Sequence, residues 1–177
     1  EAQTEAVLTS EGPLLVLAGA GSGKTRVLTY RIAHLVDDLG VAPWNILAVT
    51  FTNKAAGEMR ERLAGLVGGG LRGMWIYTFH SMCVRILRAN AEVLGYGEDF
   101  TIYDSDDSKR LVKDIMADYG YTGRSFSENA VRSRISSSKN ELVGARDYKP
   151  RPHDPLDKAT AEVFKAYQQR LKRANAM

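Results

Sequence analysis

A glycine-rich turn that ends in a lysine and a threonine carries the most specific chemistry in the sequence. Residues 17–25 read Leu-Ala-Gly-Ala-Gly-Ser-Gly-Lys-Thr, after an apolar run and before a helical pattern. Glycines let backbone N–H groups turn inward around an anion, and a helix N-terminus adds further donors. The pattern is typical of a P-loop, in which Lys24 reaches the β- and γ-phosphates of a nucleotide and the Thr25 hydroxyl ligates Mg²⁺.

The turn itself, Ala20, Gly21, Ser22 and Gly23, supplies the phosphate-binding backbone in this interpretation. One position departs from the G-x-x-x-x-G-K-[ST] pattern, because Ala18 stands where the first glycine is usual. That residue ends the expected strand, where a methyl group is tolerated. The alternative is a glycine-rich turn with a chance lysine. Because P-loops serve many reactions, the rest of the function must come from other sites.

Two further segments place hydroxyls, an aromatic ring and polar groups at the ends of expected strands. They are Thr50, Phe51, Thr52 and Asn53, and Thr78, Phe79, His80 and Ser81. Ligands bind at the carboxyl ends of parallel strands. Rings stack on unpaired bases while hydroxyls and amides hold phosphates, so these segments suit single-stranded nucleic acid. Core packing is the alternative for both rings, and helix capping is the alternative for His80.

Alternating strands and helices must position these residues. Apolar runs at 14–18, 46–51 and 75–79 predict strands, and amphipathic patterns at 24–38, 54–67 and 81–94 predict helices, the second capped by Asn53. Strands without polar alternation, joined through helices, indicate a parallel sheet covered on both faces. The first part of the chain is therefore predicted to be α/β.

After Gly95 the pattern becomes helical. Helices are expected from Asp104–Ser105 to about 120, from Ser127 to Lys139, and from Leu156 onward, with prolines forming a loop between the last two. From Val131 the sequence has 11 basic and 5 acidic residues, although the whole chain carries only +3. That excess hints at a polyanion partner, with a solvated helical face as the alternative.

The composition excludes several classes of protein. With 177 residues, 44% hydrophobic and 25% charged, the chain is globular rather than disordered or repetitive. The single cysteine, Cys83, precludes an intrachain disulfide, and its apolar neighbours predict a buried thiol. No apolar run reaches the length of a membrane span and no signal peptide is visible, so we expect a cytoplasmic protein.

The segments LAGAGSGKT, VTFTNKAAGEM and YTFHS, in this order and spacing, resemble the UvrD/PcrA/Rep family of superfamily 1 DNA helicases. The resemblance implies a partial RecA-like sheet with a P-loop over residues 1–97 (subdomain 1A) and an all-helical subdomain 1B over 98–177. It further implies that Gln3 reads the adenine edge and that Arg26 packs on the adenine face. Lys24 and Thr25 would hold phosphate and Mg²⁺, and the two strand-end segments would line the DNA track. The basic excess after Val131 would serve DNA phosphates, with Arg132, Arg134 and Lys139 as candidates.

The same resemblance implies a motor that uses ATP and Mg²⁺ to move 3′ to 5′ along single-stranded DNA and to open single/double-strand junctions, in repair or replication, with unknown accessory proteins. No acidic Walker B strand and no second RecA-like domain follow in this sequence. We therefore expect an N-terminal piece of a longer helicase that binds nucleotide weakly, hydrolyses it negligibly and, with a bare sheet edge, self-associates.

Three other functions remain open at the level of the sequence. A small-molecule or nucleotide kinase shares the P-loop but has no use for the TFTNKAA and TFHS segments. A DNA-binding module with a vestigial P-loop is the second. A recombination helicase–nuclease subunit is the third, within the same superfamily.

Overall fold

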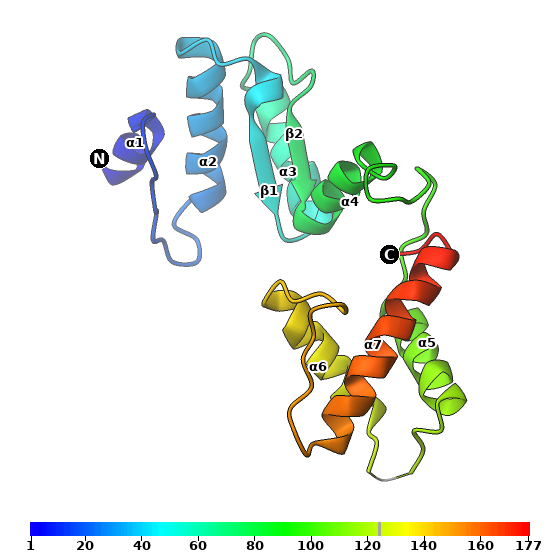
Figure 1. The fold of residues 1–177 in the computed structure, drawn as a ribbon. Helices are drawn as coiled ribbons and strands as arrows, with labels where there is room; N and C mark the ends of the chain where they lie inside the picture. The colour runs from blue at the N-terminus through cyan, green and yellow to red at the C-terminus, as the bar shows by residue number, and fades with distance from the viewer. Residues whose placement is uncertain (124) are drawn as a thin grey trace. The chain divides into compact units, whose positions relative to one another are not determined.

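The computed structural model describes residues 1–123 and 125–177 (Figure 1). The chain divides into two compact units, Glu1–Leu87 and Arg88–Met177. Each unit has its own cluster of buried apolar side chains. The assignment of 1–97 and 98–177 as subdomains 1A and 1B stays a prediction. Within the described part of the chain, no helix combines the length and apolar character needed to cross a bilayer.

The first unit is a small α/β structure. Its two strands pair in parallel and in register from Leu47–Trp75 to Thr50–Thr78, and α3 connects them as the crossover helix (Figure 1). Its elements are α1 (Ala2–Leu8), α2 (Lys24–Ala33) with a π-helical extension (His34–Asp38), a 3₁₀ turn (Pro43–Asn45), β1 (Leu47–Thr50), α3 (Asn53–Ala64), β2 (Trp75–Thr78) and α4 (Phe79–Ala89).

The strand predicted over residues 14–18 does not form, which corrects the sequence-based expectation. The described sheet contains only β1 and β2, and neither pairs with this segment. Leu15 and Leu17 are 82% and 87% exposed. A strand of this apolar kind is stable only when neighbours supply hydrogen bonds and cover both faces. The segment precedes the glycine-rich turn as extended chain, without the sheet partners that its sequence requires.

Two local details of the first unit also differ from expectation. The N-cap of α3 is Thr52, whose hydroxyl accepts a hydrogen bond from Ala55 N at 3.1 Å, and Asn53 is the first helical residue. Cys83 is exposed, which corrects the expectation of a buried thiol, and none of the described residues of α4 is buried. Apolar neighbours in sequence therefore did not indicate burial on this helix.

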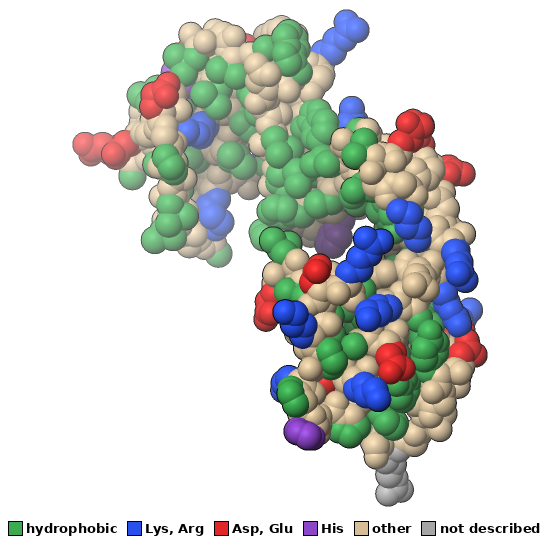
Figure 2. Space-filling view, viewed as in Figure 1, with side chains coloured by type: hydrophobic (Ala, Val, Ile, Leu, Met, Phe, Trp, Pro, Cys, Tyr) green, Lys and Arg blue, Asp and Glu red, His purple; other side chains and the backbone are tan. Residues whose placement is uncertain are grey.

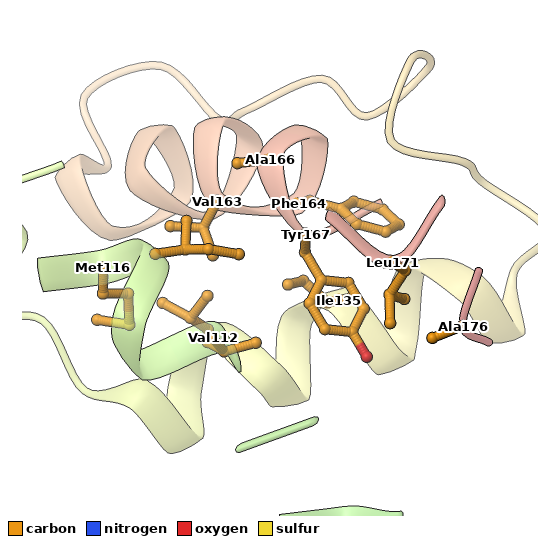
Figure 3. Close-up of a cluster of buried hydrophobic side chains, with 11 residues drawn as sticks. Val112, Met116, Ile135, Val163, Phe164, Ala166, Tyr167, Leu171 and Ala176 are labelled. Atoms are coloured by element: carbon orange, nitrogen blue, oxygen red, sulfur yellow. The ribbon is translucent and has the colours of Figure 1, made fainter. Parts of the chain in front are cut away.

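The second unit is built on three helices that begin near the predicted caps. They are α5 (Ser105–Asp118), α6 (Glu128–Asn140) and α7 (Pro155–Arg173). Asp104 and Asp107 form a capping box at α5, and Ser127 caps α6. Figure 3 shows the apolar faces of the three helices meeting around Val112, Ile135, Val163 and Phe164.

The second unit is not purely helical, because its two ends pair as a short parallel bridge. Thr101 N donates to Asn175 O at 2.9 Å, and Met177 N donates to Thr101 O at 2.9 Å. Ala176 is fully buried between these contacts. The bridge fixes the chain on both sides of the helices and satisfies backbone groups there.

Candidate nucleotide and nucleic-acid site

The glycine-rich turn has the backbone geometry that anion binding requires. Gly21 and Gly23 have φ values of +75° and +84°, in the left-handed region that glycine adopts at little cost. Lys24 is the first residue of α2, and its Nζ donates to Ala18 O at 3.2 Å and Gly19 O at 2.6 Å. The lysine side chain thus folds back over the turn. Its ammonium group is hydrogen-bonded to two backbone carbonyls, and a bound phosphate would have to take their place as the acceptor.

The donor set of this turn fits a nucleotide phosphate. Ala20 is exposed in the turn, and Lys24 and Thr25 are exposed at the start of a ten-residue helix, where unpaired N–H groups favour an anion. No group of three or more His, Cys, Asp or Glu side chains is arranged to hold a metal within residues 1–123 and 125–177. The assignment of Thr25 as a ligand for Mg²⁺ stays a prediction; its hydroxyl would supply one oxygen, and the remaining oxygens would come from the nucleotide and water.

Two glycines of the turn give a matched test of this geometry. A Cβ at Gly23 would sit 3.2 Å from Gln3 Nε2 on a backbone with positive φ, whereas a Cβ at Gly19 meets nothing within 4 Å. We expect Gly23→Ala to lower the free energy of unfolding of the first unit by about 1–2 kcal/mol and to lose nucleotide binding. Gly19→Ala should change stability by less than about 0.5 kcal/mol. Urea unfolding and Mg-ATP titration check both, and equal behaviour of the two variants would contradict the assignment.

Gln3 and Arg26, the predicted adenine contacts, lie together beside the turn. Arg26 Nη2 donates to Gln3 Oε1 at 2.8 Å, and Gln3 Nε2 donates to Ser22 O at 2.8 Å. The Gln3–Arg26 bond joins α1 to α2, and Arg31 of α2 makes a second link, because its Nη1 donates to Ala6 O of α1 at 2.9 Å. The amide of Gln3 thereby connects α1 with the glycine-rich turn.

A hollow of about 310 Å³ opens next to this pair. Its walls include residues that sequence analysis did not single out: Thr4, Val7, Leu8, Val27 and Tyr30. Val7 follows Gln3 by four positions, and Tyr30 follows Arg26 by four. Helical spacing therefore places Val7 on the same helix face as Gln3, and Tyr30 on the same helix face as Arg26. This helical spacing is the feature of the sequence from which Val7 and Tyr30 could have been predicted as neighbours of Gln3 and Arg26. The hollow offers a mainly apolar wall with a few polar groups, as ligand pockets do.

The two predicted aromatic contacts stand side by side at the strand ends. Thr50 and Thr78 are register partners, so the residues that follow them, Phe51 and Phe79, occupy equivalent positions. Their ring centroids are 5.4 Å apart with planes inclined by 50°. Phe51 is 89% exposed and Phe79 is 48% exposed. The alternative that these rings belong to the core is wrong.

The polar residues around these rings divide into two groups. The hydroxyls of Thr50 and Thr78 are buried and bond locally, to Thr52 O at 3.1 Å and to Ser81 Oγ at 2.9 Å. The side chains of Thr52, Asn53 and His80 are exposed, and Ser81 is half-buried. Thr78 Oγ1 accepts from Ser81 N at 3.2 Å, so Thr78 rather than His80 supports the start of α4. The buried threonines stabilise the turns through these hydrogen bonds. The side chains of Thr52, Asn53 and His80 are accessible to solvent.

A comparison with known families decides the assignment. The family model described as the UvrD/REP helicase N-terminal domain matches residues 1–177. The chain belongs to this family. Proteins named ATP-dependent DNA helicase PcrA are 48% identical over 176 residues in Leuconostoc citreum, 49% over 175 in Staphylococcus epidermidis and 48% over 175 in Staphylococcus aureus.

These alignments cover 99% of this chain but 24% of each relative. The chain thus spans about a quarter of the length of the curated relatives it matches. Membership of this family agrees with the prediction of a nucleotide site at the glycine-rich turn and a nucleic-acid contact at the strand ends, both in the α/β unit. The kinase alternative is thereby set aside.

Proposed function

We propose that this chain is the part of a DNA helicase that binds ATP with Mg²⁺ and grips single-stranded DNA. In a longer protein it would serve 3′-to-5′ translocation and the opening of single/double-strand junctions in repair or replication. The observation that carries the proposal is the exposed Phe51–Phe79 pair, with centroids 5.4 Å apart at the strand ends. The names of the family and of its helicase relatives support it.

The proposal gives each residue of the nucleotide site a separate role. Lys24 and the backbone of Ala20–Gly23 bind the phosphates, Thr25 ligates Mg²⁺, and Gln3 with Arg26 holds the base beside the 310 Å³ hollow. ATP, when bound and hydrolysed, supplies the energy for movement. Phosphate binding without an acidic Walker B residue leaves most of the transition-state charge unsupported. The isolated chain should therefore bind nucleotide and hydrolyse it negligibly.

The DNA track should bind bases by stacking and the backbone by polar contacts. The rings of Phe51 and Phe79 offer adjacent faces, and Thr52, Asn53 and His80 are exposed next to them. In Figure 1 the carboxyl end of β1 and the turn before α2 lie toward the same end of the first unit. This arrangement suits a protein in which nucleotide and DNA occupancy influence each other through short connections.

Substitution of the rings tests the proposed track. Stacking contributes about 1–3 kcal/mol per base, so Phe51→Ala and Phe79→Ala should each weaken binding of fluorescein-labelled oligo(dT) by about 5- to 100-fold in an anisotropy titration. Trp44→Ala is the matched control, because Trp44 is a large aromatic residue of the same unit that is 68% exposed and lies outside both strand-end segments. Unchanged affinity in both phenylalanine variants would refute the track.

A further inference from the structure

The helix that carries Gln3 has little of its own to fix it in place. α1 has seven residues, its N-cap makes no side-chain hydrogen bond, and Ala6 is the one buried residue that it contributes to the described structure. A helix of two turns is not stable in water by itself. Figure 1 shows α1 alongside α2, so contacts with α2 and with the glycine-rich turn must set its position.

The hydrogen bonds of the Gln3 side chain use the same atoms that a base would need. Its Oε1 accepts from Arg26 Nη2 at 2.8 Å, and its Nε2 donates to Ser22 O at 2.8 Å. An amide reads adenine with both groups, because its oxygen accepts from the 6-amino group while its nitrogen donates to N7. In the proposed function ATP therefore replaces both of these bonds, and α1 loses them as attachments to the rest of the unit.

Arg31 attaches α1 through groups that the base does not use. Its Nη1 donates to Ala6 O at 2.9 Å and also to Thr9 O. These carbonyls belong to the last turn and the C-cap of α1, where helix carbonyls lack intrahelical partners and a cation is favoured. Arg31 is half-buried, and none of the ion pairs among the described residues involves it. In Figure 2 basic side chains are visible over α1 and α2 among mainly uncharged atoms.

Arg31 lies near the proposed base site without lining it. Together with Lys24, Val27 and Ala6 it lines a second hollow, also of about 310 Å³, between α1, α2 and the run at 14–18. Val27 lines both hollows, whereas Arg31 is absent from the walls of the one beside Gln3. Any effect of Arg31 on the base must therefore pass through α1 rather than through direct contact.

We propose that Arg31 is a positioning residue that sets the preference for adenine by holding the helix of Gln3 in place while the amide binds the base. The inference rests on the proposed function for the role of Gln3. Hydrogen-bond distances span only about half an ångström, so the amide must be held closely. Guanine presents the acceptor O6 where adenine presents a donor, and a fixed amide oxygen therefore disfavours guanine. The phosphate contacts proposed for the turn use no atom of α1.

The preference for ATP over GTP tests the role of Arg31. Dissociation constants of Mg-ATP, Mg-GTP and Mg-tripolyphosphate are taken from the rise in melting temperature with ligand concentration. The wild-type chain should prefer ATP by about 5- to 100-fold. Arg31→Gln should lower this preference by about 3- to 10-fold and leave the affinity for tripolyphosphate nearly unchanged. Arg31→Lys keeps a cationic donor for the same carbonyls and should restore most of the preference.

Two further variants separate positioning from a general loss of charge or structure. Arg62→Gln removes the same charge from the first unit, where Arg62 makes a 3.9 Å pair with Glu58 at the surface, and should leave the preference unchanged. Gln3→Ala should abolish the preference. Adding Arg31→Gln to Gln3→Ala should lower it no further, because residues that act through one contact are not additive.

The pattern across these variants decides the inference. Equal losses for ATP, GTP and tripolyphosphate in Arg31→Gln would overturn it, because the variant would then have damaged the unit in general. An unchanged preference in Arg31→Gln, together with its loss in Gln3→Ala, would overturn the role of Arg31 and leave the proposed function intact. A wild-type chain that binds neither nucleotide, or both equally, would overturn the proposed base contact of Gln3 and this inference with it.

Discussion

Replacing Lys24 by alanine is expected to weaken binding of Mg-ATP by about 10- to 100-fold. The Nζ atom of Lys24 donates to Ala18 O and Gly19 O at 3.2 and 2.6 Å, and in the proposed function it would donate to phosphate oxygens instead when a nucleotide binds. A hydrogen bond to a charged group contributes about 1.5–3 kcal/mol, and each 1.4 kcal/mol is a factor of ten in affinity. The variant would keep the backbone of the turn and lose the proposed lysine contact with the phosphates.

Ligand-induced stabilisation measures this loss. A ligand that binds only the native state raises stability by about 2.7 kcal/mol at one hundred times its Kd. Melting of the wild-type chain should therefore move upward with Mg-ATP concentration, and the Lys24→Ala curve should need far more nucleotide for the same shift. Lys54→Ala is the control, because the Lys54 side chain is 88% exposed and only 4.0 Å from Glu58 in a weak surface pair. No shift in the wild type would favour a DNA-binding module with a vestigial P-loop.

Helix starts in the second unit were predictable because each depends on a few neighbouring residues. Asp104 caps α5 through its side chain, which accepts from Asp106 N and Asp107 N, and Ser127 caps α6. Pro155 is acceptable at the first turn of α7, so the proline-rich loop ended where the helix began. Local side-chain chemistry determines such boundaries, and no knowledge of distant contacts is needed.

The misjudged elements depend on contacts that sequence patterns do not contain. The run at 14–18 has the composition of a buried strand, but pairing requires neighbouring strands. Cys83 has apolar neighbours, yet α4 has no buried residue in the described structure. Phe51 and Phe79 were predicted as DNA contacts with core packing as the alternative, and the structure shows that they are exposed and form a ring pair at neighbouring strand ends.

Charge counts misled for the same reason. The excess of basic residues after Val131 was real, but it did not show which of them were already paired. Arg134 is held by two aspartates, whereas Arg146 and Arg173 make no ion pair among the described residues. The composition predicts a basic surface that could bind a polyanion. Only side-chain geometry shows which basic residues are not already paired within the described part of the protein.

The carboxylate of Asp157 organises the loop between α6 and α7. It is 3% exposed. Tyr148 donates to Oδ1 at 2.5 Å, Arg151 N donates to Oδ2 at 2.7 Å, and Arg134 lies 2.9 Å away. Burial raises the pKa of Asp157, but these hydrogen bonds and the charge of Arg134 outweigh it and leave the pKa below its usual range. Burial, and then the bond to Asp157, raises the pKa of Tyr148 to about 12.

A carboxylate with a depressed pKa stabilises the fold only when it is ionised. Its contribution is complete above the unfolded pKa of about 3.9 and is lost as the pH falls through the lower folded value. The pKa of Asp154 is also lowered, chiefly by its hydrogen bond from Arg134. The second unit should therefore lose stability steeply below about pH 4, and part of that loss should disappear when Asp157 can no longer ionise.

Asp157→Asn is expected to lower the free energy of unfolding of the second unit by about 3 kcal/mol. Removing one member of a buried ion pair leaves its partners with unmatched charge, which costs about 3–5 kcal/mol. The lower end applies because the side chain of Arg151 is 66% exposed and can turn to water. Asp118→Asn is the control: its pair with Arg170 is largely exposed, and such pairs contribute at most about 1 kcal/mol.

The two tryptophans let the experiment assign the loss to one unit. Trp44 and Trp75 both lie in Glu1–Leu87, so their fluorescence reports the first unit, whereas far-ultraviolet circular dichroism also reports α5, α6 and α7. With an m-value of about 1–3 kcal/mol per molar urea, the helical transition of Asp157→Asn should move down by about 1–3 M. The fluorescence transition should stay in place. A helical midpoint equal to that of Asp118→Asn, or an equal shift in both signals, would show that the Asp157 network does not stabilise the second unit in this way.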